Sequence, residues 1–183
     1  MASVLDNQLS NRSFLYPQGF KFMISKIPTV SFYSSTANIP EISFPPLEFN
    51  TRFKTIPIEN TIAEYSDLTV DFMVDEDMQN YMAIFNWMQG LAFPDNHLQY
   101  KNLVTDEDGN RNELLSKSDG SLVIYNNNYN PNIIVKYKDL FPVKLSSLSF
   151  NSKLKSPEPL TGQATFTYTS YSIVDTSGKP LWT

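Results

Sequence analysis

One stretch of the sequence, from Asp67 to Pro94, changes its hydrophobic period halfway, and this change constrains the fold more than any other feature. Apolar and polar residues alternate from Leu68 to Val74, which is the pattern of a half-buried strand. Apolar residues then recur at helical spacing, at Met78, Tyr81, Ile84, Phe85 and Met88. The stretch therefore predicts a strand that runs directly into one amphipathic helix at about 76–89.

Both ends of this predicted helix carry capping signals. Asp75, Glu76 and Asp77 supply an N-cap candidate and negative charge where the free N–H groups and the positive end of the helix dipole lie. Gly90 fits the left-handed position that follows many helices. We therefore expect the helix to end at Gly90 and Phe85 to lie in the core.

The composition and the spacing of strands favour one β-rich domain. A chain of 183 residues can bury one sizeable core but not two. Thirteen Phe and ten Tyr stand beside only six Gly, and aromatic side chains suit pleated surfaces. We predict a mainly β fold, an antiparallel β-barrel or sandwich of about eight strands with one flanking α-helix and extended arms and loops. The expected strands lie within 19–27, 30–40, 51–58, 68–74, 121–127, 131–140, 141–150 and 163–174.

Four segments fall outside this pattern. Residues 1–17 are predicted to form an N-terminal arm, and residues 175–183 a short C-terminal tail, on either side of a single domain at 18–174. Three prolines make 40–49 an extended connector, and 95–120 is predicted to be a long polar loop. Loops of that length usually have a function or are ordered by a partner.

Residue types that carry catalysis are scarce. The absence of cysteine excludes disulfides, thiolate nucleophiles and Cys-bound metals. His97 is the only histidine, and with Asp95 it could form the acid–base pair of a hydrolase, although a solvated loop histidine explains it better. No nucleotide-binding or hydrolase motif occurs. We therefore predict no enzyme, no catalytic residue and no cofactor.

The charged residues give little support for metal, duplex or membrane binding. The acidic clusters 75–77 and 106–108 lack the alternating carboxylates of a calcium loop, so capping and solubility explain them better and no metal is predicted. A net charge of −5 without a Lys or Arg run argues against a duplex-binding groove. No apolar run approaches a membrane span, so we predict no membrane insertion.

Several apolar residues lie where little sheet is expected to bury them, which suggests association. The arms 1–17 and 40–49 carry Leu, Phe and Ile, and a single helix leaves strand edges or a sheet face for another copy. A monomeric sandwich with loose termini is the alternative on pattern alone. The predicted subunit-contact residues are Phe14, Tyr16, Ile39, Pro40, Arg52 and Trp182.

Short motifs along the chain resemble those of the tail-tube proteins of contractile-tailed bacteriophages. They are Ile39–Pro40, Asn50 with Arg52, Leu68–Val70, Asp75–Asp77 and Asn86–Trp87. Residues 130–150 followed by 164–171 are similar to the final strands of that family. The resemblance spans about 18–174, whereas 95–120 and the tail after Val174 have no clear counterpart.

The resemblance implies a structural virion protein that is assembled in the host cytoplasm and works in the tail. Hexameric rings of the subunit would stack into a tube that conducts DNA, in contact with tail sheath and baseplate proteins. An acidic lumen would suit DNA passage, because a like-charged wall does not trap a polyanion. The extra loop and arm would also suit a baseplate tube-initiator, a cap or a tail-terminator ring.

An alternative of a different class is a carbohydrate-binding β-sandwich module. In that hypothesis Trp87, Trp182 and surface tyrosines stack on sugars. Packing of Trp87 in the core or in an interface explains its place on the helix better.

Overall fold

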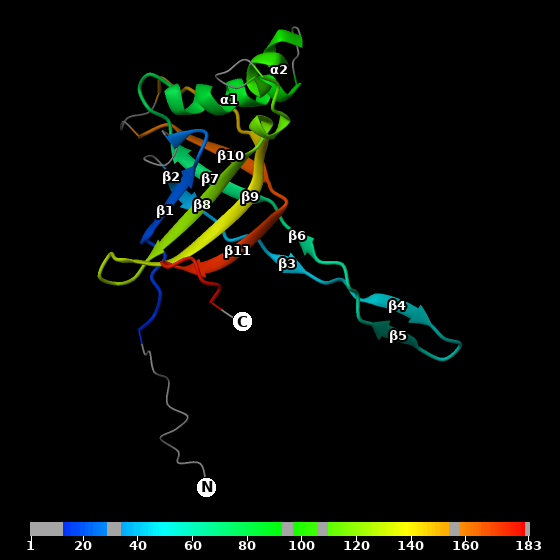
Figure 1. Ribbon diagram of the computed structural model, residues 1–183. Coiled ribbons are helices and arrows are strands. Elements are labelled where there is room, and N and C mark those ends of the chain that lie inside the picture. Colours follow the sequence, from blue (N-terminus) through cyan, green and yellow to red (C-terminus); the bar gives the residue numbers. More distant parts are fainter. Residues whose placement is uncertain (1–12, 29–33, 93–96, 106–109, 154–157, 182–183) are drawn as a thin grey trace.

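Two antiparallel sheets that share one long strand form the body of the protein (Figure 1). The computed structural model describes residues 13–28, 34–92, 97–105, 110–153 and 158–181. Strands β1 (Phe20–Ile24), β8 (Ser118–Tyr125), β9 (Pro131–Leu145), β10 (Thr161–Thr167), β7 (Leu68–Met73) and β2 (Ser34–Ala37) follow one another in that order across the body. β11 (Ser170–Asp175) pairs with β9 outside this path. This confirms the mainly β, antiparallel fold class. β1 and β2 are the two end strands of this order and do not pair with each other.

β9 is the strand that joins the two sheets. Its first part pairs with β8 and β11, and its last residues pair with β10. The register with β8 shifts next to Asp139, whose φ of 55° lies in the left-handed region that Asp tolerates better than most residues. A second shift occurs opposite Thr165 and Phe166, beside Pro142. Both irregularities bend β9 where it leaves one sheet and enters the other.

These strands differ from the prediction at two places. The expected strands 131–140 and 141–150 are one strand that ends at Leu145. The expected last strand, 163–174, is two strands, because β10 and β11 pair with different parts of β9.

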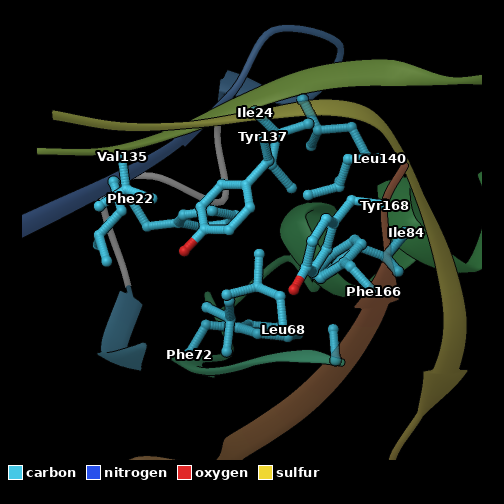
Figure 2. Close-up of a cluster of buried hydrophobic side chains, with 14 of the residues drawn as sticks. Phe22, Ile24, Leu68, Phe72, Ile84, Val135, Tyr137, Leu140, Phe166 and Tyr168 are labelled. Atoms are coloured by element: carbon cyan, nitrogen blue, oxygen red, sulfur yellow. The ribbon is translucent and has the colours of Figure 1, made fainter. Parts of the chain in front are cut away.

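The core lies between the two sheets and is closed at one end by α1 (Gln79–Ala92), as Figure 2 shows. The ring centroids of Phe22 and Phe166 are 6.3 Å apart, and those of Trp87 and Phe166 are 6.4 Å apart. The indole N–H of Trp87 donates to the carbonyl of Ser116 at 2.8 Å, so this polar group is satisfied although the side chain is buried.

The helix starts later than predicted and turns a different face to the core. The carboxylate of Asp75 accepts the N–H of Asn80 at 3.1 Å, so the predicted negative charge does meet a free N–H group. The buried residues of α1 are Asn80, Ile84, Trp87 and Gly90, whereas Phe85 is 38% exposed. Asn80 can be buried because its amide donates to the carbonyl of Met73. The expected core position of Phe85 is therefore wrong.

Gly90 does not end the helix. It lies inside α1 and is buried, and a Cβ atom on it would approach the side chain of Leu103 to 3.2 Å. Leu103 belongs to α2 (His97–Val104), so the glycine permits the two helices to pack closely.

The predicted loop 95–120 and the prediction of a single helix are also corrected. The segment contains α2, the 3₁₀ helix η3 (Glu113–Ser116) and the start of β8. Only Val104 of α2 is buried, so its sequence carries little amphipathic signal. In the predicted C-terminal tail, Pro180 forms an isolated antiparallel β-bridge with Val174 of β11.

A two-ribbon arm projects from the body between β2 and β7 (Figure 1). Its near ribbon pairs β3 (Ile42–Ser43) with β6 (Glu64–Tyr65), and its far ribbon pairs β4 (Leu47–Asn50) with β5 (Thr55–Ile58). The predicted connector 40–49 therefore contains β3 and most of β4.

We expect Phe166→Ala to lower the free energy of unfolding by about 3–5 kcal/mol, because it opens a cavity in the centre of the core. Phe85→Ala removes a half-exposed ring, and we expect a loss of about 1–2 kcal/mol. Denaturant unfolding of both variants measures the difference. Equal losses would contradict the assignment of Phe85 to the outer side of α1.

Candidate functional site: an exposed arm with one apolar face

The far ribbon of the arm has two chemically different faces. Directly opposite residues of antiparallel strands share a face, and Leu47 pairs with Ile58 while Phe49 pairs with Ile56. All four apolar side chains therefore lie on one side, and each is about half exposed. The other side carries Glu48 with Pro57 and Asn50 with Thr55.

Further exposed apolar residues lie at both ends of the far ribbon. Phe53 in the turn is 92% exposed, and Phe44 and Ile62 on the body side of the ribbon are 59% and 68% exposed. Exposed apolar surface that is contiguous rather than scattered marks an interaction site. A two-strand ribbon alone is also marginally stable in water. The geometry therefore suits docking against another protein surface.

The turn at the tip is closed by its own hydrogen bonds. The hydroxyl of Thr51 accepts the N–H of Lys54 at 3.1 Å and donates to its carbonyl. Thr55 donates to the side chain of Asn50 at 2.7 Å. Arg52 stands at this tip, with its guanidinium 5.9 Å from the ring of Phe53. The tip thus presents an exposed aromatic ring between two cations, Arg52 and Lys54.

Four tyrosines meet where the arm joins the body. They are Tyr65 of β6, Tyr137 of β9, Tyr168 between β10 and β11, and Tyr171 of β11. Ring centroids of contacting pairs lie 5.3–6.3 Å apart. Burial, followed by the nearby Tyr171, Asp67 and Tyr65, raises the pKa of Tyr168 to about 12. Burial also raises the pKa of Tyr137 and Tyr171 above the usual value. The cluster therefore favours neutral phenols.

The predicted contact residues fall at different places. Tyr16 and Ile39 line one largely apolar groove of about 310 Å³ that runs past β1 and β2. Phe14 is exposed and lines a neighbouring hollow with Asn127. Pro40 is buried at the base of the arm. Arg52 is exposed at the tip, and Trp182 lies outside the described residues.

The predicted strand within 51–58 is confirmed as β5, but 40–49 was interpreted as an extended connector and the apolar face of the far ribbon was not recognised. The alternation of Leu47 and Phe49, and of Ile56 and Ile58, is a usable strand signal. Prolines at 45, 46 and 57 obscured it, because proline is normally confined to strand ends and edges.

The structure gives little support to the two alternatives, a carbohydrate-binding module and a hydrolase that uses His97 and Asp95. Trp87 is only 2% exposed, so its predicted role as a sugar-stacking platform is wrong. His97 lies on α2 and lines a hollow of about 500 Å³ with Lys101 and Arg111, while Asp95 lies outside the described residues. In the described ranges no group of three or more His, Asp or Glu side chains could hold a metal ion. No described helix is both long and apolar enough to cross a membrane.

A family model described as phage tail tube protein matches residues 12–174. The chain therefore belongs to the phage tail tube protein family, and the resemblance found in its motifs is confirmed. A search of curated proteins finds no match.

Solved structures show the same fold. A chain of the anti-feeding prophage cap, the AFP tube terminating cap, is 15% identical with a TM-score of 0.61, over 96% of this chain and 99% of that one. A chain of the PVC sheath-tube complex, an extracellular contractile injection system in its extended state, is 12% identical with a TM-score of 0.58, over 90% and 93%. A chain of the AFP baseplate is 9% identical with a TM-score of 0.54, over 91% and 97%.

We expect the free energy of unfolding to fall as the pH rises from about 10 to about 12. The raised pKa of Tyr168 means that the folded state favours its neutral form, so this contribution is complete below pH 10 and is lost as the pH approaches 12. Unfolding curves at several alkaline pH values measure the slope. Tyr168→Phe is expected to reduce that slope, and an unchanged slope would contradict the role of this phenol.

Proposed function

We propose that this protein is a self-assembling tube subunit of a phage tail and that the apolar face of its arm packs on a neighbouring copy. The observation that carries the proposal is a set of four apolar side chains, Leu47, Phe49, Ile56 and Ile58, left uncovered on one side of a projecting ribbon. Membership of the tail tube family supports a second copy as the partner.

The energetics of the arm favour assembly. Each of the four half-exposed side chains gains about 1 kcal/mol when a neighbour covers it. That gain is small for one arm, but closed symmetry repeats it at every interface of a ring. We infer hexameric rings that stack into a tube, with sheath and baseplate proteins as partners, as the family resemblance implies. The protein then works by assembly, without catalytic chemistry.

The outer faces of the two sheets suggest which one faces the lumen. Strands β2, β7 and β10 contain no Lys or Arg, and their outward side carries Thr, Ser and Gln around Asp71. The carboxylate of Asp71 accepts the amide of Gln163 at 2.8 Å. The outward side of β9, in contrast, carries the exposed Lys136 and Lys138. We propose that the β2–β7–β10 face lines the lumen, because it is poor in cations and such a wall does not trap DNA. The exposed Lys144 of β9, opposite Thr165, lies at the edge of this face.

A cap, terminator or baseplate ring is the second candidate. The solved structures of similar fold include a tube terminating cap and a baseplate as well as a sheath-tube complex. A tube subunit stacks on its own rings, whereas a cap or terminator stops after one layer. Electron microscopy of the purified protein separates the two, because stacked annuli support the tube and single rings support the second candidate.

We expect Phe49→Ser combined with Ile56→Ser to abolish ring formation, because the two substitutions remove one cross-strand pair from the apolar face. Both side chains are about half exposed, so the melting temperature of the subunit should change little. Analytical ultracentrifugation and negative stain measure assembly.

Glu48→Gln is the matched control, since Glu48 lies on the opposite face of the same ribbon. This variant should assemble like the wild type. Assembly of the double variant at wild-type concentrations would contradict the proposed role of the arm, and a strictly monomeric wild type at high concentration would contradict the tube itself.

A further inference from the structure

Two tyrosine hydroxyls hold the base of the arm to the body. Tyr168 donates to the carbonyl of Ser66 at 2.8 Å, and Tyr171 donates to the carbonyl of Pro40 at 3.2 Å. Pro40 precedes β3 and Ser66 follows β6, so each of the two chain segments that enter the arm is bonded once. The N–H of Ser66 also donates to the carbonyl of Glu41 at 3.0 Å, which ties the two segments to each other.

Ring packing adds to these bonds. Tyr65 of the near ribbon contacts the rings of Tyr168 and Tyr171 edge to face, at 6.3 Å and 5.8 Å. Both of these rings contact Tyr137, which is 1% exposed and anchored in β9. Edge-to-face aromatic pairs are mutually attractive. The near ribbon is therefore fixed to the strand that joins the two sheets.

The next part of the arm lacks such bonds. Residues 44–46 on one side and 59–63 on the other separate the near ribbon from the far ribbon, and within the described chain no backbone hydrogen bond joins them. Pro45 and Pro46 have no N–H group to offer. An open hollow of about 410 Å³, lined by Phe44 and Pro46 among others, lies beside this segment and leaves room for a bend.

Beyond this gap the arm is again internally bonded. β4 and β5 pair over four residues each, and the turn at Thr51–Lys54 closes on itself. The N–H of Ile62 donates to the side chain of Asn60 at 3.1 Å, but this bond is local to one side of the gap. The order along the arm is thus a fixed base, a segment whose two sides are not joined by backbone hydrogen bonds, and a bonded end.

We propose that the arm is a jointed device, in which the tyrosine cluster locks the base and 44–46 with 59–63 form an elbow about which the far ribbon turns. The elbow lets the apolar face of the far ribbon adjust to a neighbouring copy while its starting point stays fixed. Docking on a neighbouring copy rests on the proposed function, whereas the turning of the far ribbon about the elbow is a property of the single chain and does not.

Distances between spin labels on one chain test the proposal. The protein has no cysteine, so pairs of introduced cysteines are labelled selectively. Lys136→Cys on β9 with Glu64→Cys reports the base, and Lys136→Cys with Glu48→Cys reports the far ribbon; all three positions are exposed. The distances are measured on the dissociated subunit, because docking on a neighbouring copy would itself narrow the far-ribbon distribution. Labelled protein is diluted with unlabelled protein, so that each distance is read within one chain.

We expect a narrow distance distribution for the base and one about twofold wider for the far ribbon. Tyr168→Phe with Tyr171→Phe removes both hydroxyl bonds but keeps both rings, and should widen the base distribution about twofold. Tyr129→Phe, in the exposed turn between β8 and β9, is the control and should leave both distributions unchanged.

Two results would overturn the proposal. One is a far-ribbon distance distribution as narrow as that of the base in protein whose tyrosine cluster is unaltered. The other is an unchanged base distribution in the double Phe variant. A protein that never forms rings would refute the tube function but would leave these distances, and the elbow, as measured.

Discussion

The apolar face of the far ribbon is surface that this chain does not bury by itself, and the rest of the structure can be understood as the support for it. The core between the two sheets is complete, with Phe22, Phe72 and Phe166 fully covered. The arm leaves that body between β2 and β7 and carries its apolar residues into solvent (Figure 1). A ribbon of two short strands gains too little from its own pairing to be stable alone. We propose that its burial comes from a neighbouring copy.

The body gives the arm a defined starting point. β9 belongs to both sheets, and Tyr137 on that strand is the buried member of the cluster at the base of the arm. The hydroxyl of Tyr137 is the one buried side-chain polar atom in the described chain without a hydrogen-bond partner. Its ring, rather than its hydroxyl, therefore does the packing, while Tyr168 and Tyr171 supply the hydrogen bonds. A fixed attachment of this kind favours ring closure, since repeated contacts close into a ring only when each copy presents its surfaces at a consistent angle.

Local pattern was enough to predict the strand before α1, the negative charge that meets its N-terminus and the mainly antiparallel fold, since these depend on neighbours in sequence. Which face of α1 is buried could not be predicted in this way. Asn80 is buried because its amide donates to the carbonyl of Met73, a residue outside the helix, and the pattern of apolar residues in the helix does not reveal this bond. β9 was divided in the prediction because a proline inside a strand is tolerated only at irregularities such as the one beside Pro142. The apolar arm was recognised only in part, since its strands bury nothing within the chain.

Hydrogen exchange at the amides of 47–50 and of Thr55, Ile56 and Ile58 tests the central claim most directly. The measurement compares the assembled protein with the dissociated subunit at the same pH and temperature. Our account predicts that these amides are strongly protected in the assembly and exchange rapidly in the subunit, while those of β8 and β9 are protected in both states. Equal exchange of the ribbon amides in the two states would contradict it.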